Sequence, residues 1–238
     1  MGIPVYKRIV LKISGESLAG DKENVINPEA ITSVSKEIES AKYLGVELAV
    51  VVGGGNIVRG QLSKLGVVDR VSADHMGMLA TIINALALQD NLEGLGLSSR
   101  VMSAVHIDTL TEPYVKREAL RHLKDGKVVI LAGGTGNPYF TTDTSAALRA
   151  IEIEADVLMK GTKVNGVYDD DPVKNPSAKM FDSLSYTDVL NRRLKVMDLT
   201  AISLCMENKL PIIVFNLKEP GNLKKILSGE KIGSKVRG

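Results

Sequence analysis

The chain has 238 residues, of which 44% are hydrophobic, and its 30 basic and 28 acidic residues leave a formal net charge of +2. This composition excludes a disordered or fibrous protein, and it gives no bulk field that would recruit nucleic acid or a membrane, so any anion must be bound locally. The single cysteine, Cys205, lies in an apolar stretch. This excludes an intramolecular disulfide and predicts a core position in a reducing compartment.

The N-terminal segment does not resemble a signal peptide, because Lys7 and Arg8 interrupt its apolar run. The most apolar stretch, residues 76–88, is shorter than the roughly 20 residues that cross a bilayer. We therefore expect a cytoplasmic protein with neither a membrane nor a nucleic-acid partner.

Strands and helices alternate along the first 150 residues. A β-branched strand over residues 5–13 precedes a helix that starts at Asn27-Pro28, where asparagine is a preferred N-cap and proline suits the first helical position. The next expected elements are strand 46–52, helix 72–92, strand 100–105, helix 112–124 and strand 128–132. The helix over residues 72–92 is apolar on nearly every face, so we expect it to be covered by its own lobe or by another subunit.

The remaining residues continue this alternation. A helix near Asp143 precedes a strand over residues 155–159, and Asn165-Gly166 then predicts a tight hairpin. An irregular loop follows over residues 169–180, and after it come helices 186–190 and 198–209, strand 211–217, and a last helix and tail over 221–238. The pattern predicts an α/β three-layer sandwich, with one mostly parallel central sheet, helices on both faces, and two lobes at about residues 1–150 and 151–238.

Three predicted strands end in small residues that lead toward a helix: Lys12-Ile13-Ser14-Gly15, Gly53-Gly54-Gly55-Asn56 and Gly133-Gly134-Thr135-Gly136-Asn137-Pro138. Glycine lets backbone amides approach phosphate oxygens, and a following helix adds a partial positive charge. One such turn is more often a tight turn alone, but three in one sheet favour phosphate binding.

Two standard phosphate-binding templates do not fit these turns. The dinucleotide fingerprint fails at both Gly53 and Gly134, so a Rossmann oxidoreductase loses support. The Walker A pattern fails because Gln61 and Asp21 replace its lysine, which excludes a P-loop NTPase.

The chain resembles bacterial UMP kinases of the amino-acid-kinase fold over almost its whole length. The resemblance is carried, in order, by Lys12-Ile13-Ser14-Gly15-Glu16, residues 53–60, Asp74-His75-Met76-Gly77-Met78, residues 134–143, residues 160–168, Asp171-Pro172 and Val196-Met197-Asp198. It implies an enzyme of pyrimidine nucleotide biosynthesis that transfers the γ-phosphoryl group of ATP to UMP.

The resemblance also implies which residues act. The implied ATP-binding residues are Lys12, Ile13, Ser14, Gly15, Gly55, Arg59, Thr162, Tyr168 and Asp171. The implied UMP-binding residues are Gly54, Asp74, Thr135, Gly136, Asn137, Pro138, Tyr139, Phe140, Thr141 and Thr142. The implied catalytic residues are Lys12, Arg59, Asp143 and Lys160, with Asp143 organising the lysines around the transferred group.

Several of these residues have an independent chemical rationale. Lys12 and Arg59 can each neutralise charge on phosphate oxygens. Asp74 can accept hydrogen bonds from ribose hydroxyls near a helix start, although helix capping explains an aspartate there equally well. The residues alone do not choose between Lys160 and Lys163, of which we favour Lys160.

Neither a catalytic histidine nor a protein metal site is expected. An acceptor phosphate has its second pKa at about 6 and is largely a dianion at neutral pH, so it can attack without a general base. Mg²⁺ should be bound with ATP, mainly by the phosphates and water, with Asp143 as the side chain that could steer it.

The resemblance further implies a homohexamer, inhibition by UTP, and activation by GTP at a loop of Gly20, Asp21, Lys22, Glu23, Asn24 and Val25. Two alternatives remain open. One is a non-catalytic nucleotide-binding or storage protein of the same fold. The other is a different phosphotransferase of that fold, which phosphorylates acetylglutamate, aspartate or carbamate.

Overall fold

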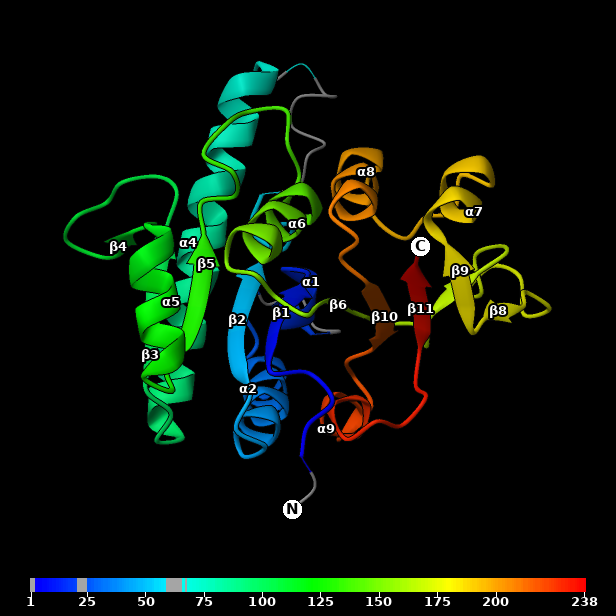
Figure 1. Ribbon diagram of the computed structural model, residues 1–238. Helices are drawn as coiled ribbons and strands as arrows, with labels where there is room; N and C mark the ends of the chain where they lie inside the picture. The colour runs from blue at the N-terminus through cyan, green and yellow to red at the C-terminus, as the bar shows by residue number, and fades with distance from the viewer. Residues whose placement is uncertain (1–2, 21–24, 59–65, 67) are drawn as a thin grey trace.

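A mixed β-sheet runs through the whole molecule in the computed structural model, which describes residues 3–20, 25–58, 66 and 68–238 (Figure 1). Its strands, in chain order, are β1 (Arg8–Ile13), β2 (Glu47–Val52), β3 (Ser99–Ser103), β4 (Glu112–Pro113), β5 (Val128–Ala132), β6 (Val157–Thr162), β9 (Ser183–Ser185), β10 (Ile212–Asn216) and β11 (Ser234–Arg237). Their order across the sheet is β4-β3-β5-β2-β1-β6-β10-β11-β9, and neighbours run parallel except β10 and β11. Strands from before residue 150 therefore lie on one side of the β1–β6 boundary and strands from after it on the other.

Helices cover both faces of this sheet. One face is covered by α1 (Glu16–Ala19), α2 (Pro28–Lys42), α4 (Arg70–Gly94) and α9 (Asn222–Leu227), and the other by α5 (Lys116–Lys124), α6 (Thr142–Glu152), α7 (Tyr186–Asn191) and α8 (Leu199–Glu207). Because side chains alternate along a strand, Ile9 and Leu11 of β1 enter the first core and Val10 enters the second. The predicted three-layer α/β sandwich is confirmed.

Cys205 lies in the second core, on α8, with none of its surface exposed. Burial raises the pKa of its thiol to about 12, and the nearby carboxylate of Asp198 adds to the effect. The thiol is therefore un-ionised and unreactive at neutral pH.

Three details of the predicted secondary structure are wrong. Glu112–Pro113 forms the edge strand β4 and α5 begins only at Lys116, because the residue before a proline disfavours helical geometry and an edge strand tolerates the missing N–H. Asn165-Gly166 makes no hairpin with β6; instead β7 (Val167–Tyr168) pairs with β8 (Met180–Phe181) in a separate small sheet. The expected C-terminal tail forms β11.

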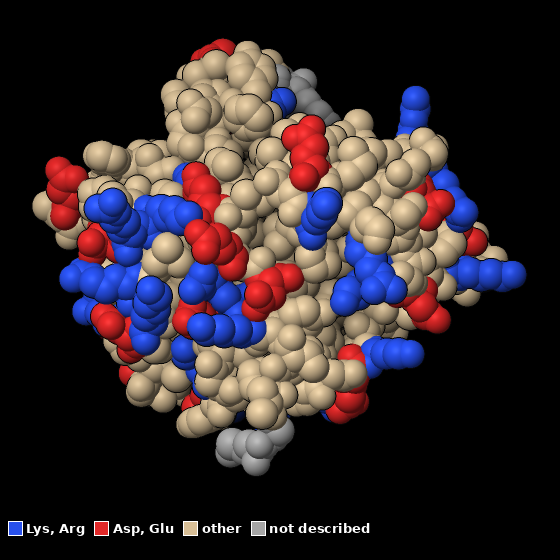
Figure 2. Space-filling view, in the orientation of Figure 1, with Lys and Arg blue, Asp and Glu red and all other residues tan. Residues whose placement is uncertain are grey.

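The long apolar helix α4 is covered on one side only. Its inner side packs against β2, β3 and β5, with Leu88 and Leu92 fully buried. On its outer side Met76, Leu79 and Ile83 are 39%, 47% and 50% exposed. We call these three residues the α4 stripe. Figure 2 shows few charges on the surface that projects above the sheet at α4, whereas charges of both signs gather over α5.

The length of α4 departs from the expectation drawn from residues 76–88. At 25 residues it is long and apolar enough, by length and composition alone, to cross a membrane, and no other helix in the described ranges is. Its contacts with three strands, however, place it on the sheet as a core helix.

The buried carboxylate of Glu37 connects helix α2 to helix α9, which lies near the C-terminus. Glu37 of α2 is 6% exposed and accepts hydrogen bonds from the backbone amides of Gly221 at 2.6 Å and Leu223 at 3.3 Å. These amides belong to the first turn of α9, which has no side-chain cap of its own. Glu37 thus supplies the cap of α9 from a distant part of the sequence.

We expect Glu37→Leu to lower the free energy of unfolding by about 2 kcal/mol, because it leaves buried amide donors without an acceptor. Glu37→Gln keeps one acceptor oxygen and should cost less. Urea denaturation measures both, with Glu39→Gln as a control on the same helix that is expected to change stability by less than about 0.5 kcal/mol. Equal stabilities of Glu37→Leu and Glu39→Gln would contradict this role.

Candidate active site

The three glycine turns lie together at the carboxyl ends of neighbouring central strands. They follow β1, β2 and β5, which are neighbours in the order β5-β2-β1 and run parallel, so their carboxyl ends lie together. The first two turns touch, since the Gly53 amide donates to the Ile13 carbonyl at 2.9 Å. A Cβ on Gly15 would collide with the Asn56 side chain and lie 2.8 Å from the Gly53 carbonyl oxygen, so only glycine permits this approach.

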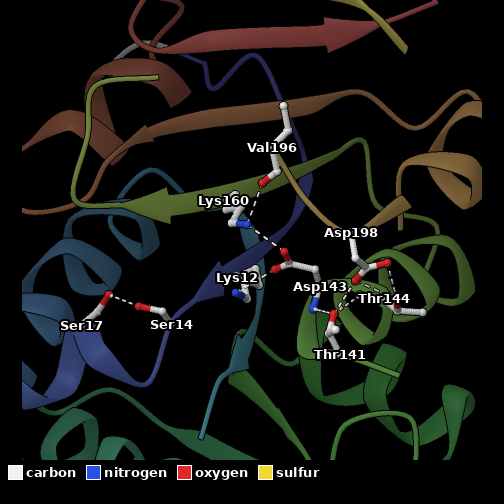
Figure 3. A network of polar contacts seen from close by, with 9 residues as sticks. All are labelled: Lys12, Ser14, Ser17, Thr141, Asp143, Thr144, Lys160, Val196 and Asp198. Carbon is white, nitrogen blue, oxygen red and sulfur yellow. Dashed lines mark hydrogen bonds and ion pairs between the residues drawn. The ribbon is translucent and has the colours of Figure 1, made fainter. Parts of the chain in front are cut away.

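Two lysines flank one carboxylate beside these turns (Figure 3). Lys12 of β1 and Lys160 of β6 are paired residues of adjacent parallel strands, so their side chains project to the same face of the sheet. Lys12 Nζ lies 2.7 Å from Asp143 Oδ1, and Lys160 Nζ lies 2.7 Å from Asp143 Oδ2. The side chains of Lys12, Lys160 and Asp143 are only 9%, 17% and 14% exposed, respectively. We call these three residues the Lys12–Asp143–Lys160 cluster, and they are largely shielded from water.

The cluster shifts the pKa values of its members. Burial acts to raise the pKa of Asp143, but the two ammonium groups outweigh it and hold that pKa below its ordinary value. Burial lowers the pKa of Lys160, Asp143 opposes the shift, and the neighbouring charge of Lys12 reinforces it. Asp143 is therefore ionised at neutral pH, with both of its oxygens directed at ammonium groups.

The segment before α8 holds the cluster in place. The Val196 carbonyl accepts from Lys160 Nζ at 2.7 Å. Asp198, the N-cap of α8, accepts from the Thr141 hydroxyl and, at 2.9 Å, from the Thr144 hydroxyl. These bonds tie the first turn of α6, which carries Asp143, to α8. The sequence motif Val196-Met197-Asp198 includes this residue but does not reveal its role, because Thr141 and Thr144 lie more than 50 residues away in the sequence.

A cavity of about 320 Å³ opens between the second turn, the third turn and α4. Six of the residues expected to bind UMP line it: Gly54, Asp74, Thr135, Phe140, Thr141 and Thr142. Gly55, expected on the ATP side, lines it as well. Gly136, Asn137, Pro138 and Tyr139 do not line it, and the Tyr139 side chain is 68% exposed.

Asp74 joins the cavity wall to the third turn. Its Oδ2 accepts from the Tyr139 amide and from Arg70 Nε, each at 2.8 Å. Asp69, not Asp74, is the N-cap of α4. The capping explanation for Asp74 is therefore wrong, and the carboxylate faces the cavity with one anchored oxygen.

The residues expected to bind ATP are not gathered in one cavity. Ser14 lies beside Ser17, with their hydroxyl oxygens 3.0 Å apart, and Thr162 and Ser17 line a hollow of about 340 Å³ near α2. Tyr168 and Asp171 line another, of about 290 Å³, together with residues 192–195. A larger cavity, of about 620 Å³ by β10, β11 and α9, contains none of the expected site residues.

Five residues expected to bind nucleotides lie outside the described residues: Asp21, Lys22, Glu23, Asn24 and Arg59. Lys163 is exposed, whereas Lys160 contacts Asp143. Within the described ranges, no three His, Cys, Asp or Glu side chains gather as metal ligands would.

Comparisons with known proteins identify the family of the chain. The sequence profile described as "Amino acid kinase family" matches residues 7–216. The chain is 51% identical over 234 residues to the chloroplastic uridylate kinase PUMPKIN of Arabidopsis thaliana, covering 98% of this chain and 69% of that protein. Its structure superposes on a UMP kinase from Bacillus anthracis with a TM-score of 0.94 at 40% identity, covering 98% of this chain and 96% of that one. A UMP kinase from Ureaplasma parvum gives a TM-score of 0.91 at 38% identity, with coverages of 98% and 99%. The chain therefore belongs to the amino acid kinase family.

Proposed function

We propose that this protein is a UMP kinase, which transfers the γ-phosphoryl group of ATP to UMP and releases UDP and ADP in pyrimidine nucleotide biosynthesis. The observation that carries the proposal is the Lys12–Asp143–Lys160 cluster beside three glycine turns, in a chain whose relatives include a uridylate kinase and UMP kinases. A protein that only stored nucleotides would have no need of two buried ammonium groups held by one carboxylate.

The chemistry follows from charge and position. Phosphoryl transfer needs in-line alignment and stabilisation of charge on the non-bridging oxygens, and it needs little covalent participation by the protein. Lys12 and Lys160 present two ammonium groups at the carboxyl end of the sheet, and the backbone amides of the turns add further donors. Asp143 fixes both ammonium groups before substrate arrives, so little reorganisation remains for the reaction itself.

The cavity beside the third turn suits a pyrimidine nucleotide. Thr135, Thr141 and Thr142 line it with hydroxyl and backbone groups that can match the donors and acceptors of uracil. Asp74 offers a carboxylate to ribose hydroxyls. We assign the hollows lined by Thr162 and by Tyr168 and Asp171 to ATP.

Mg²⁺ enters with ATP in this scheme and offsets the charge of its phosphates. The residues present fit that arrangement, because both oxygens of Asp143 are already paired with lysines and other clustered carboxylates are absent from the described ranges. Asp143 thus positions lysines rather than holding the metal.

Self-association is the second part of the proposal. The α4 stripe leaves three large apolar side chains exposed at positions i, i+3 and i+7 of one helix, the spacing of a helix-packing face. We propose that a second copy of the chain covers it, within a homohexamer. Activation by GTP, inhibition by UTP and a cytoplasmic location stay predictions, and the Arabidopsis relative is described as chloroplastic.

A coupled assay of ADP formation, with ATP, Mg²⁺ and a panel of nucleoside monophosphates, tests the proposed reaction. Turnover with UMP supports it, whereas nucleotide binding without turnover would identify a storage protein. Hydroxylamine trapping of an acyl phosphate would reveal a carboxylate kinase of the same family.

We expect Lys12→Met and Lys160→Met each to lower kcat by about 10²- to 10³-fold, because each removes a cation from the transferred group. UMP binding should change by less than about twofold. Lys163→Met is the matched control, since that side chain is exposed three residues from Lys160. Steady-state rates and UMP calorimetry measure the effects. A kcat loss in Lys163→Met as large as in Lys160→Met would reverse the assignment of the two lysines.

We expect Asp74→Asn to raise the KM for UMP about tenfold, because it replaces a charged acceptor by a neutral one at the cavity wall. The KM for ATP should change by less than about twofold. Asp69→Asn, which preserves a good N-cap on the same helix, should leave both KM values unchanged. Equal changes for ATP and UMP in Asp74→Asn would indicate a structural role instead.

We expect Ile83→Lys to dissociate the assembly, because it places a charge on the most exposed residue of the α4 stripe. Sedimentation velocity should then show mainly the 25.6 kDa chain. Val173→Lys is the control, since Val173 is 81% exposed and lies far from α4 in sequence. An unaltered assembly in Ile83→Lys, or a wild-type monomer with full activity, would contradict this interface.

A further inference from the structure

Helix α4 lies directly against the second glycine turn. A Cβ on Gly54 would stand 2.7 Å from the Gly77 carbonyl oxygen and 2.8 Å from Cβ of Ala80. No side chain separates the turn from the helix at this point, so their relative position is set by direct contact. Any shift of α4 is therefore passed to Gly54, which lines the proposed UMP cavity.

A pair of side-chain amides fixes this contact. Asn84 of α4 is fully buried and donates from Nδ2 to the Gly53 carbonyl and to Asn56 Oδ1, both at 2.7 Å. Asn56 donates in return from Nδ2 to Asn84 Oδ1 at 3.0 Å and to the Val25 carbonyl at 2.6 Å. All four amide N–H groups of the pair are satisfied.

The carbonyl of Gly53 dictates how the pair is oriented. A carbonyl can only accept, so Asn84 must turn its NH₂ group toward it, and its oxygen must then face Asn56. The Asn56 oxygen in turn occupies the space that a Cβ on Gly15 would need. The amide pair thus fixes the second turn to α4 and also sets its distance from the first.

A second buried side chain of α4 reaches the third turn. Thr81 is 2% exposed, and its hydroxyl donates to the Met78 carbonyl at 2.7 Å while it accepts from the Gly133 amide at 2.8 Å. Thr81 and Asn84 are three residues apart, on neighbouring turns of one helix face. The two side chains therefore reach different glycine turns from the same face of α4.

Polar side chains at these places are not explained by packing. The inner side of α4 is otherwise apolar, and a buried polar group destabilises the fold unless it is fully hydrogen-bonded. Both Thr81 and Asn84 direct their bonds at the backbone of a glycine turn. Their bonds thus fix the backbone of two glycine turns relative to α4.

We propose that Asn84 and Thr81 are positioning residues with different targets: Asn84, with Asn56, holds the second turn, which lines the UMP cavity and contacts the first turn on the ATP side, and Thr81 holds the third turn, on the UMP side alone. The nucleotide named at each turn rests on the function proposed above. Helix α4, which also bears the α4 stripe, is the element that links both substrate sites to the surface of the molecule.

The test compares variants of nearly equal shape by calorimetric titration with MgATP alone and with UMP alone. Asn84→Leu should raise the Kd values for ATP and for UMP, each about three- to tenfold, the range expected of one neutral hydrogen bond. Thr81→Val should raise the Kd for UMP by a similar factor and change that for ATP by less than about twofold, and Thr81→Ser, which keeps the hydroxyl, should restore UMP binding. Asn56→Ala tests the amide pair from the side of the turn and should match Asn84→Leu.

Leu88→Ala is the control, because it opens a cavity in the same helix face, one turn farther on, without touching a glycine turn. It should lower the melting temperature and leave both Kd values unchanged. A Thr81→Val variant that weakens ATP and UMP equally, an Asn84→Leu variant that weakens only one of them, or variants of both residues that behave like Leu88→Ala, would overturn the proposal. The Kd values decide this question without turnover, so a wild-type protein that binds both nucleotides but makes no UDP would contradict only the proposed function. A wild-type protein that binds neither nucleotide would overturn both.

Discussion

The site depends on one carboxylate held between two ammonium groups. Two lysines on adjacent strands, each less than one-fifth exposed, would repel one another and lose much of their hydration if nothing stood between them. Asp143 resolves this conflict, since each of its oxygens lies 2.7 Å from one Nζ. One net positive charge remains on the cluster, at the end of the sheet where the glycine turns lie. The proposed function uses this charge to bind phosphate.

Every layer of the fold contributes to that arrangement. The parallel register of β1 and β6 places Lys12 beside Lys160, and a shift by one residue would send one of them to the opposite face. Helix α6 delivers Asp143 in its first turn, where the helix dipole favours a carboxylate. Asp198 then ties that turn to α8 through two threonine hydroxyls. The geometry of the cluster is therefore supported by regular secondary structure, because Lys12 and Lys160 lie on strands and Asp143 lies on a helix.

The parts of this arrangement that local sequence encodes were predictable. The glycine turns, the alternation of elements and the N-cap at Asn27 follow from short-range patterns, and all three are present. The secondary structure was predicted wrongly in regions where contacts between distant residues determine it. Gly166 serves close packing against the Ser234 and Met180 side chains rather than a hairpin, and β11 exists because β10 and β9 offer it free edges. Likewise the contact of Asp74 with Tyr139 and the bonds of Asp198 to Thr141 and Thr144 join residues far apart in the sequence, so they become clear only in the folded structure.

The buried polar residues of α4 follow the same logic. From the sequence alone, this is a long apolar helix, and the only prediction is that its own lobe or another subunit covers it. The structure gives this helix two sides with different tasks: an inner side whose Thr81 and Asn84 contact the backbone of glycine turns, and an outer stripe of large apolar side chains. Both sides belong to the same helix, and Gly54 lies against it without an intervening side chain. A partner that packs on the stripe would therefore also restrain the helix at Gly54. The helix that carries the stripe thus touches a glycine turn directly, and the glycine is required because any larger residue would separate them.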